Sequence, residues 1–268
     1  MRFALINSGL GLLATASELH KLRPDADLVI AMDPDGMPWG PRTPQDIAER
    51  SLAIARASAS FEPDVIIMAC NTGTVHALEV LRAEFEPAVP VVGTVPAIKP
   101  AASAAGTVAI WATVATTRSD YQRRLISEFG GNADFTSVAC PGLATAVDAG
   151  DSEAIDAAIA DAAERTPIDC GALVLGCTEY ELAADLIGAA VPGVRLFGTA
   201  AAVAAQAMRR VALTGRDLTP ASDDQSGTLT VLLSGREGNL PPAAMQYRQG
   251  RELARLAVRH DPTAGVPA

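Results

Sequence analysis

Short apolar runs alternate with longer segments of mixed character along most of the chain. Runs such as Phe3–Ile6, Asp27–Met32 and Asp64–Ala69 are bounded by polar residues, Gly or Pro. Such runs are typical of strands that are buried on both faces of a parallel sheet. The segments between them, including Leu13–Leu22 and Thr74–Phe85, are predicted to be helices. This alternation of strand and helix indicates a doubly wound α/β fold.

The same alternation starts a second time near residue 107. Thr107–Trp111, Phe135–Ala139 and Ala172–Leu175 are the predicted strands of this second half. The crossings between the halves predict a discontinuous first domain, residues 1–95 plus 199–268, and a second domain, residues 96–198. We expect two similar α/β domains with largely parallel sheets, related by a pseudo-two-fold axis. The functional site is expected in the cleft between them.

Other segments complete the predicted element order. Helices are predicted over Pro44–Ser60 (with Thr43 as the N-cap), Asp120–Phe129, Ser152–Arg165, Glu181–Ala190 and Thr199–Leu213. Strands are predicted over Pro90–Gly93, Arg195–Gly198 and Thr228–Ser234. The remaining predictions are a hydroxyl-rich turn over Ala112–Ser119, a loop over Pro220–Ser226, helical structure over Pro241–Val258 and a frayed tail over Pro262–Ala268.

The composition allows a large core and argues against several classes of partner. With 268 residues, of which 49% are hydrophobic and 19% charged, the chain can form one large or two moderate domains. A formal net charge of −10 argues against nucleic acid and against an anionic membrane surface. The uncharged stretch Pro100–Thr117 is rich in small residues, so no membrane span is predicted. Neither Lys21 nor Lys99 has a persuasive context for a pyridoxal phosphate Schiff base.

The cysteines are predicted to be reduced thiols of a cytoplasmic protein. Cys70, Cys140, Cys170 and Cys177 form no C-x-x-C pair and no Cys/His pattern of a metal site. No metal is therefore predicted. Cys140 and Cys170 are interpreted as small buried hydrophobic residues.

Cys70 and Cys177 differ because they end matching apolar segments, Asp64–Ala69 and Gly171–Gly176. The thiols would then lie just past the carboxyl ends of strands, where open α/β sheets place their ligands. A helix that begins there favours the thiolate and also binds carboxylates. Two such positions in two similar halves predict two thiols that face one acidic substrate from opposite sides.

Six motifs in this order resemble the aspartate/glutamate racemase superfamily, and most closely glutamate racemases. They are Asn7-Ser8-Gly9-Leu10-Gly11, Pro38-Trp39-Gly40, Ala69-Cys70-Asn71-Thr72, Val92-Gly93-x-x-Pro96, Ala112-Thr113 with Thr116, and Leu175-Gly176-Cys177-Thr178-x-Tyr180. Each motif alone is weak, but together they cover nearly the whole chain.

The resemblance implies a cofactor-independent isomerase that racemises an acidic amino acid, with glutamate as the first expectation and aspartate as the second. It places the enzyme in the cytoplasm and in peptidoglycan biogenesis for the cell wall. Cys70 and Cys177 would be the acid/base pair, one on each face of the α-carbon. The implied partner is a small acidic amino acid or dicarboxylate, and a homodimer is allowed. The implied substrate-binding residues are Ser8, Trp39, Gly40, Asn71, Thr72 and Thr178, joined by Thr113 and Thr116 from the second domain.

The sequence departs from the glutamate racemase pattern at the positions expected to assist the two thiols. Asn7 stands where those racemases have an aspartate, and Glu179 stands where they have a histidine. Asn cannot take a proton, and a Glu carboxylate beside a thiol raises the thiol's pKa. Cys-Thr-Glu is nevertheless the form seen in aspartate racemase-like members. Trp39 replaces the usual tyrosine.

Two alternatives to racemisation therefore stay open. One is another superfamily reaction on a small dicarboxylate. The other is a catalytically weak amino-acid-binding or regulatory protein that kept the pocket.

Overall fold

The computed structural model describes residues 1–219 and 226–258, and within these ranges the strands form two separate sheets. The larger sheet has the order β10-β9-β2-β1-β3-β4, and β11 pairs with β9. Its strands are β1 (Arg2–Asn7), β2 (Asp27–Met32), β3 (Val65–Met68), β4 (Val91–Gly93), β9 (Thr228–Leu233), β10 (Arg236–Gly238) and β11 (Ala257–Val258). All pairings in it are parallel except that of β10 with β9.

The smaller sheet contains four parallel strands in the order β6-β5-β7-β8. They are β5 (Thr107–Ala112), β6 (Asp134–Ala139), β7 (Ala172–Leu175) and β8 (Arg195–Phe197). Two α/β units with largely parallel sheets are thus confirmed. Strand β9, near the C-terminus, pairs with β2 of the first sheet, so the chain returns to that sheet after leaving the second. The domain limits at residues 95 and 198 stay a prediction.

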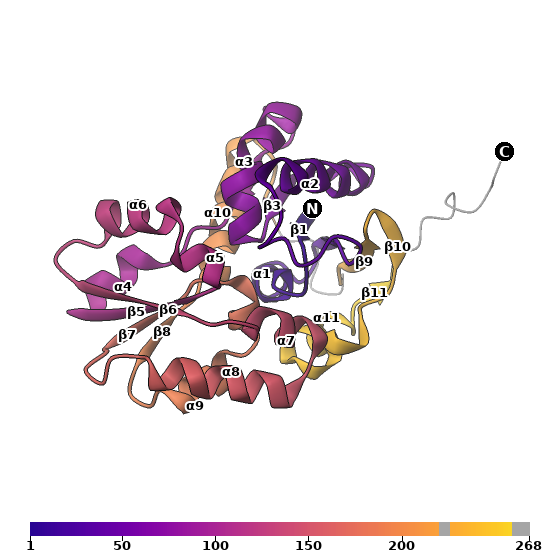
Figure 1. Cartoon of the computed structure of the whole chain (residues 1–268). Coiled ribbons are helices and arrows are strands. Elements are labelled where there is room, and N and C mark those ends of the chain that lie inside the picture. Colours follow the sequence, from indigo (N-terminus) through magenta and orange to yellow (C-terminus); the bar gives the residue numbers. More distant parts are fainter. Residues whose placement is uncertain (220–225, 259–268) are drawn as a thin grey trace.

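Helices cover both faces of the larger sheet (Figure 1). One face packs against α2 (Pro44–Ala59) and α3 (Asn71–Phe85), which contribute Ile47, Ile54 and Leu81 to a buried apolar cluster. The other face packs against α1 (Leu12–Leu22) and α10 (Ala200–Leu213). Because both faces are covered, β3 consists entirely of buried apolar residues, and so does the middle of β1, Phe3–Ile6.

The smaller sheet is also covered on both faces (Figure 1). One face carries α4 (Ile98–Ala104) and α6 (Asp120–Phe129), and the other carries α7 (Leu143–Ala149), α8 (Ser152–Glu164) and α9 (Ala184–Ala190). The cluster on the second of these faces continues into the cluster under α1 and α10. The two sheets therefore share one continuous apolar core.

The structure corrects several predicted elements. Residues 241–258 are not one helical segment but contain η2 (Pro242–Gln246), α11 (Arg248–Leu253) and β11. The reason is nonlocal, because β11 forms by pairing with β9. Glu181–Ala190 begins as a 3-10 turn, η1 (Thr178–Glu181), and only α9 is helical beyond it. The predicted turn over 112–119 contains α5 (Val114–Thr117).

Helix α7 and strand β10 were not predicted. Helix α7 has only seven residues and lies between Gly142 and Gly150, whose φ angles of 79° and 65° favour glycine. The predicted loop over Pro220–Ser226 lies almost entirely outside the described residues, and the predicted tail over Pro262–Ala268 lies wholly outside them. Within the described part of the chain, no helix is long and apolar enough to cross a membrane.

Candidate active site

Cys70 lies where β3 gives way to α3, and it is the N-cap of this helix. Its backbone is extended, and its Sγ accepts a hydrogen bond from the Gly73 N–H at 3.4 Å. The position places the sulfur at the positive end of a helix of 15 residues. The side chain is almost completely buried.

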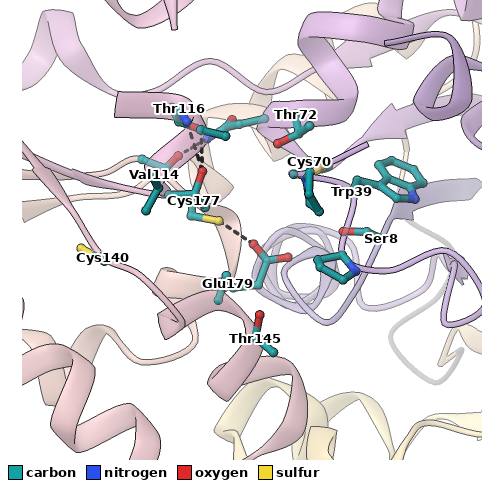
Figure 2. Close-up of a pocket in the computed structure, with 18 of the residues that line it drawn as sticks. Ser8, Trp39, Cys70, Thr72, Val114, Thr116, Cys140, Thr145, Cys177 and Glu179 are labelled. Carbon is teal, nitrogen blue, oxygen red and sulfur yellow. Dashed lines mark hydrogen bonds between the residues drawn. The ribbon is translucent and has the colours of Figure 1, made fainter. Parts of the chain in front are cut away.

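Cys177 occupies the corresponding place in the smaller sheet, where β7 leads into η1. Its Sγ donates a hydrogen bond to Oε2 of Glu179 at 2.8 Å (Figure 2). The residue accepts no side-chain capping hydrogen bond from η1, unlike Cys70 in α3. The two thiols thus have matching places in the fold but different polar partners.

Both thiols line one cavity of about 420 Å³. In Figure 2, Ser8, Trp39, Cys70 and Thr72 come from the first half of the molecule, whereas Val114, Thr116, Cys140 and Cys177 come from the second. The cavity is therefore formed by both α/β units. Its lining includes these predicted site residues: Ser8, Trp39, Gly40, Cys70, Asn71, Thr72, Thr113, Thr116, Cys177 and Glu179.

Two predicted site residues, Asn7 and Thr178, do not line the cavity. Both are buried behind its wall, and Asn7 Nδ2 donates a hydrogen bond to Thr178 Oγ1 at 3.3 Å. Their place in the fold follows from the ends of β1 and β7, which bring the two turns together. The role of Thr178 in substrate binding stays a prediction.

Trp39 lines the cavity with an indole whose polar atom is already used. Its Nε1–H donates to Asp33 Oδ2 at 3.0 Å, and Ser234 Oγ donates to Asp33 Oδ1 at 3.0 Å. The ring is buried in the same apolar cluster as Cys70 and Met68. Trp39 can therefore offer a ligand its ring face and backbone but not its indole N–H.

Burial and one carboxylate govern the ionisation of both thiols. Burial, followed by the charge of Glu179, raises the pKa of Cys70 to about 12. Backbone N–H groups of Gly73 and Thr72 act in the opposite direction. Burial and then Glu179 also raise the pKa of Cys177 well above its ordinary value. Both thiols are therefore protonated at neutral pH when the cavity holds no compensating positive charge.

Asp148 is an acidic group of the cavity that the sequence interpretation missed. It lies near the end of α7, and its Oδ1 accepts the Leu10 N–H at 2.7 Å. Burial and the nearby charge of Glu179 raise its pKa to about 8, so this carboxyl is largely neutral at pH 7. The only sequence signal was a single acidic residue in the otherwise uncharged stretch between Pro141 and Gly150.

The remaining lining residues were not predicted as site residues, and most of them lie on α5 and α7 or beside these helices. They are Pro38, Pro41, Val114, Ala115, Arg118, Cys140, Pro141, Gly142, Ala144, Thr145 and Gly176. Arg118 is the cationic side chain of this lining, and it lies on the exposed side. Across residues 1–219 and 226–258, no group of three or more His, Cys, Asp or Glu side chains is arranged to hold a metal ion.

Comparison with known proteins matches residues 7–207 to the family described as Asp/Glu/hydantoin racemase. A glutamate racemase of Herpetosiphon aurantiacus is 36% identical over 214 residues, which cover 78% of this chain and 84% of that protein. A glutamate racemase of Pseudomonas putida strain W619 is 33% identical over 214 residues, covering 78% of this chain and 80% of the relative.

The chain is also similar in structure to solved glutamate racemases. Escherichia coli glutamate racemase in complex with L-glutamate and the activator UDP-MurNAc-Ala has a TM-score of 0.75 at 26% identity, with 91% of each chain covered. Thermus thermophilus glutamate racemase in complex with β-chloro-D-alanine has a TM-score of 0.70 at 27% identity. That match covers 97% of this chain and 96% of the other.

Proposed function

This chain belongs to the Asp/Glu/hydantoin racemase family, and we propose that it racemises an acidic amino acid, glutamate first, without a cofactor. The observation that carries the proposal is the position of Cys70 and Cys177. They lie at the ends of equivalent strands in two separate sheets, and they line one cavity. Inversion of a stereocentre by proton transfer needs one group on each face of the carbon, and this arrangement supplies one thiol from each half.

In the proposed reaction one cysteine thiolate removes the proton from the substrate α-carbon. The opposite cysteine thiol then donates its proton to the other face of the resulting carbanion. One C–H bond breaks and one forms, and the two cysteines exchange protonation states, so the enzyme needs no external oxidant or base. The α-carbon proton is a weak acid. Donors at the α-carboxylate must therefore stabilise the carbanion-like transition state.

The cavity has suitable donors for that carboxylate. Thr72 lies in the first turn of α3, and Thr113 is the N-cap of α5. Thr116 is hydrogen-bonded to Thr113, with their hydroxyl oxygens 3.0 Å apart. Backbone N–H groups at the start of α3 add positive potential. We assign the substrate α-carboxylate to the part of the cavity between the two thiols, next to these threonines and the start of α3.

The raised pKa values of the thiols fit this proposal when the substrate's ammonium group is considered. A positive charge near a thiol favours the thiolate and opposes the effect of burial. Binding of the amino acid would thus lower the pKa of the adjacent thiol as the reaction begins. At Cys177, Glu179 Oε2 already accepts the thiol hydrogen bond and can receive its proton.

Aspartate is the second candidate substrate, and Glu179 is the residue that favours it, because Cys-Thr-Glu is the form seen in aspartate racemase-like members. The relatives reported above are glutamate racemases, which supports glutamate as the first candidate substrate.

A racemisation assay with the L- and D-forms of glutamate and aspartate tests the proposal. Circular dichroism follows the loss of optical activity, and proton NMR in D₂O follows exchange at the α-carbon. We expect interconversion of glutamate that ethylenediaminetetraacetate does not inhibit. The proposal would be contradicted if neither exchange nor interconversion occurred with the L- or D-form of either amino acid at saturating substrate concentrations. Binding without exchange would favour an amino-acid-binding protein, and turnover of a dicarboxylate alone would favour another superfamily reaction.

A further inference from the structure

Two asparagine side chains connect the turns that carry Cys70 and Cys177. Asn7 Nδ2 donates to the carbonyl oxygen of Ala69, directly before Cys70, at 2.8 Å. The same nitrogen donates to Thr178 Oγ1, directly after Cys177, at 3.3 Å. One amide group at the end of β1 therefore contacts a residue next to each of the two cysteines.

Asn71 makes the reciprocal connection. It directly follows Cys70, and its Nδ2 donates to the carbonyl oxygen of Gly176, directly before Cys177, at 2.8 Å. Its Oδ1 accepts a hydrogen bond from Thr94 Oγ1 at 2.5 Å. Thr94 is completely buried and follows β4, where the chain leaves the larger sheet.

The orientation of both amides is fixed by their partners. The carbonyl oxygens of Ala69 and Gly176 can only accept hydrogen bonds, so the NH₂ group must face them. The Ser8 N–H can only donate, and it donates to Asn7 Oδ1 at 2.7 Å. Asn7 is fully buried with both donors and its acceptor in use, so it has no atom free for a substrate.

We propose that Asn7 and Asn71 are positioning residues that form an amide clasp and fix the separation of the two thiols. The clasp is defined as Asn7, Asn71 and their partners Ala69, Thr178, Gly176 and Thr94. This inference rests on the proposed two-thiol racemisation. It gives Asn7 a role other than that of a weakened acid/base group.

The chemistry makes the separation important. Each sulfur must contact the same α-carbon, and misplacement of a reacting group by about 1 Å can cost on the order of a hundredfold in rate. The thiols belong to different sheets, so their separation depends on contacts between the two α/β units. Hydrogen bonds immediately beside each cysteine restrict that separation more directly than packing elsewhere in the core.

The clasp also predicts the effect of restoring an aspartate at position 7. Asp is nearly isosteric with Asn but has no N–H donors when ionised. In Asn7→Asp a carboxylate would face the Ala69 carbonyl oxygen, which cannot donate. We therefore expect kcat for glutamate to fall by about tenfold to a hundredfold in both directions, with KM changing by less than about threefold. A gain in kcat would overturn the clasp and identify Asn7 as a lost acid/base group.

Thr94 provides a matched pair of variants outside the cavity. Thr94→Val keeps the shape but removes the hydroxyl that holds Asn71 Oδ1, whereas Thr94→Ser keeps the hydroxyl. We expect Thr94→Val to lower kcat equally for both enantiomers and Thr94→Ser to restore most of the loss. Equal rates for Val and Ser would overturn the role of Asn71. A rise confined to KM would instead identify Asn71 as a substrate ligand.

A thermal unfolding cycle tests the clasp independently of activity. Asn71→Ala and Thr94→Val should each lower Tm by about 2–4 °C, and the double variant should fall by little more than the larger single effect. Fully additive shifts would contradict the shared hydrogen bond. If the wild-type protein racemises no acidic amino acid but the cycle shows coupling, the proposed function fails while the clasp remains. If the wild type is active and Asn7→Asp is fully active, the clasp alone fails.

Discussion

The turns at Cys70 and Cys177 occupy equivalent places in the two sheets but surround their thiols differently. Cys70 caps a long helix and accepts a backbone N–H, whereas Cys177 precedes a single 3-10 turn and donates to a carboxylate. A helix N-terminus favours a thiolate, and a neighbouring carboxylate favours a thiol while offering its proton a destination. Equivalent positions therefore need not give equivalent chemistry.

Glu179 adds to the difference between the two thiols, although its charge affects the pKa of groups on both sides of the cavity. Its charge is the second cause of the raised pKa at Cys70, at Cys177 and at Asp148. Of these three groups, however, only Cys177 donates a hydrogen bond to Glu179. We infer that the two directions of racemisation depend unequally on Glu179, and the following predictions test this asymmetry.

Loss of either thiol should have the largest effect. Cys70→Ser and Cys177→Ser should each lower interconversion by at least about a hundredfold, because a hydroxyl is a far weaker acid/base group than a thiol. Each variant should lose α-carbon deuterium exchange with a different enantiomer, measured by NMR in D₂O. Cys170→Ser, at a buried thiol outside the cavity, is the control. Near-wild-type racemisation by either active-site variant would rule out the two-thiol mechanism.

Glu179→Gln should separate the two directions. Gln keeps the shape of Glu but cannot receive the Cys177 proton, so exchange with the enantiomer for which Cys177 is the base should fall by about a hundredfold. Exchange with the other enantiomer should fall less. Removing the charge should also lower the pKa of Cys70, so the pH–rate limb governed by Cys70 should move to lower pH. Kinetics of each enantiomer from pH 6 to 10 provide the measurement.

Glu181→Gln is the matched control for this change. Glu181 lies in the same 3-10 turn but accepts backbone N–H groups of Thr199 and Ala200 instead of contacting the cavity. We expect its substitution to lower stability without changing the ratio of the two directions. Equal losses in both directions for Glu179→Gln would contradict the inferred asymmetry.

Features that depend on local sequence patterns could be predicted, whereas features that depend on packing between distant segments could not. β2, α6 and β7 have the predicted bounds, because each is a local pattern with clear ends. The sequence predicted that both thiols face one cavity, because open α/β sheets bind their ligands at the carboxyl ends of the strands. Helix α7 and its Asp148 were missed, because the helix is short and its role depends on packing against the turn at Leu10.

The hydrogen bonds between the halves could not be predicted for a related reason. Asn7 meets Thr178 across a large sequence separation, and no local pattern reports such a contact. The sequence predicted both residues as part of the site, but it could not show that they lie behind the cavity wall.

Asp148 should give the protein a measurable dependence of stability on pH. Its pKa is raised from 3.8 to about 8 in the folded protein. Between these values the folded state keeps a proton that the unfolded state releases, so this group lowers stability as pH rises. The slope is at most about 1.4 kcal/mol per pH unit. Asp148→Asn should flatten the dependence in urea unfolding between pH 5 and 8. Asp156→Asn, at an exposed position of α8, should leave it unchanged.

The smallest expected effect concerns the capping role that only one of the cysteines has. Cys70 Sγ accepts the Gly73 N–H, whereas Cys177 receives no such bond from its turn. A Ser side chain is a good N-cap and Ala is a poor one, so Cys70→Ser should be more stable than Cys70→Ala by about 1 kcal/mol. The corresponding pair at Cys177 should differ less, because η1 is too short to gain much from a cap. Urea unfolding of the four variants at one pH measures both differences. A larger difference at Cys177 would mean that its hydrogen bond to Glu179, and not the cap at Cys70, is the stronger local restraint.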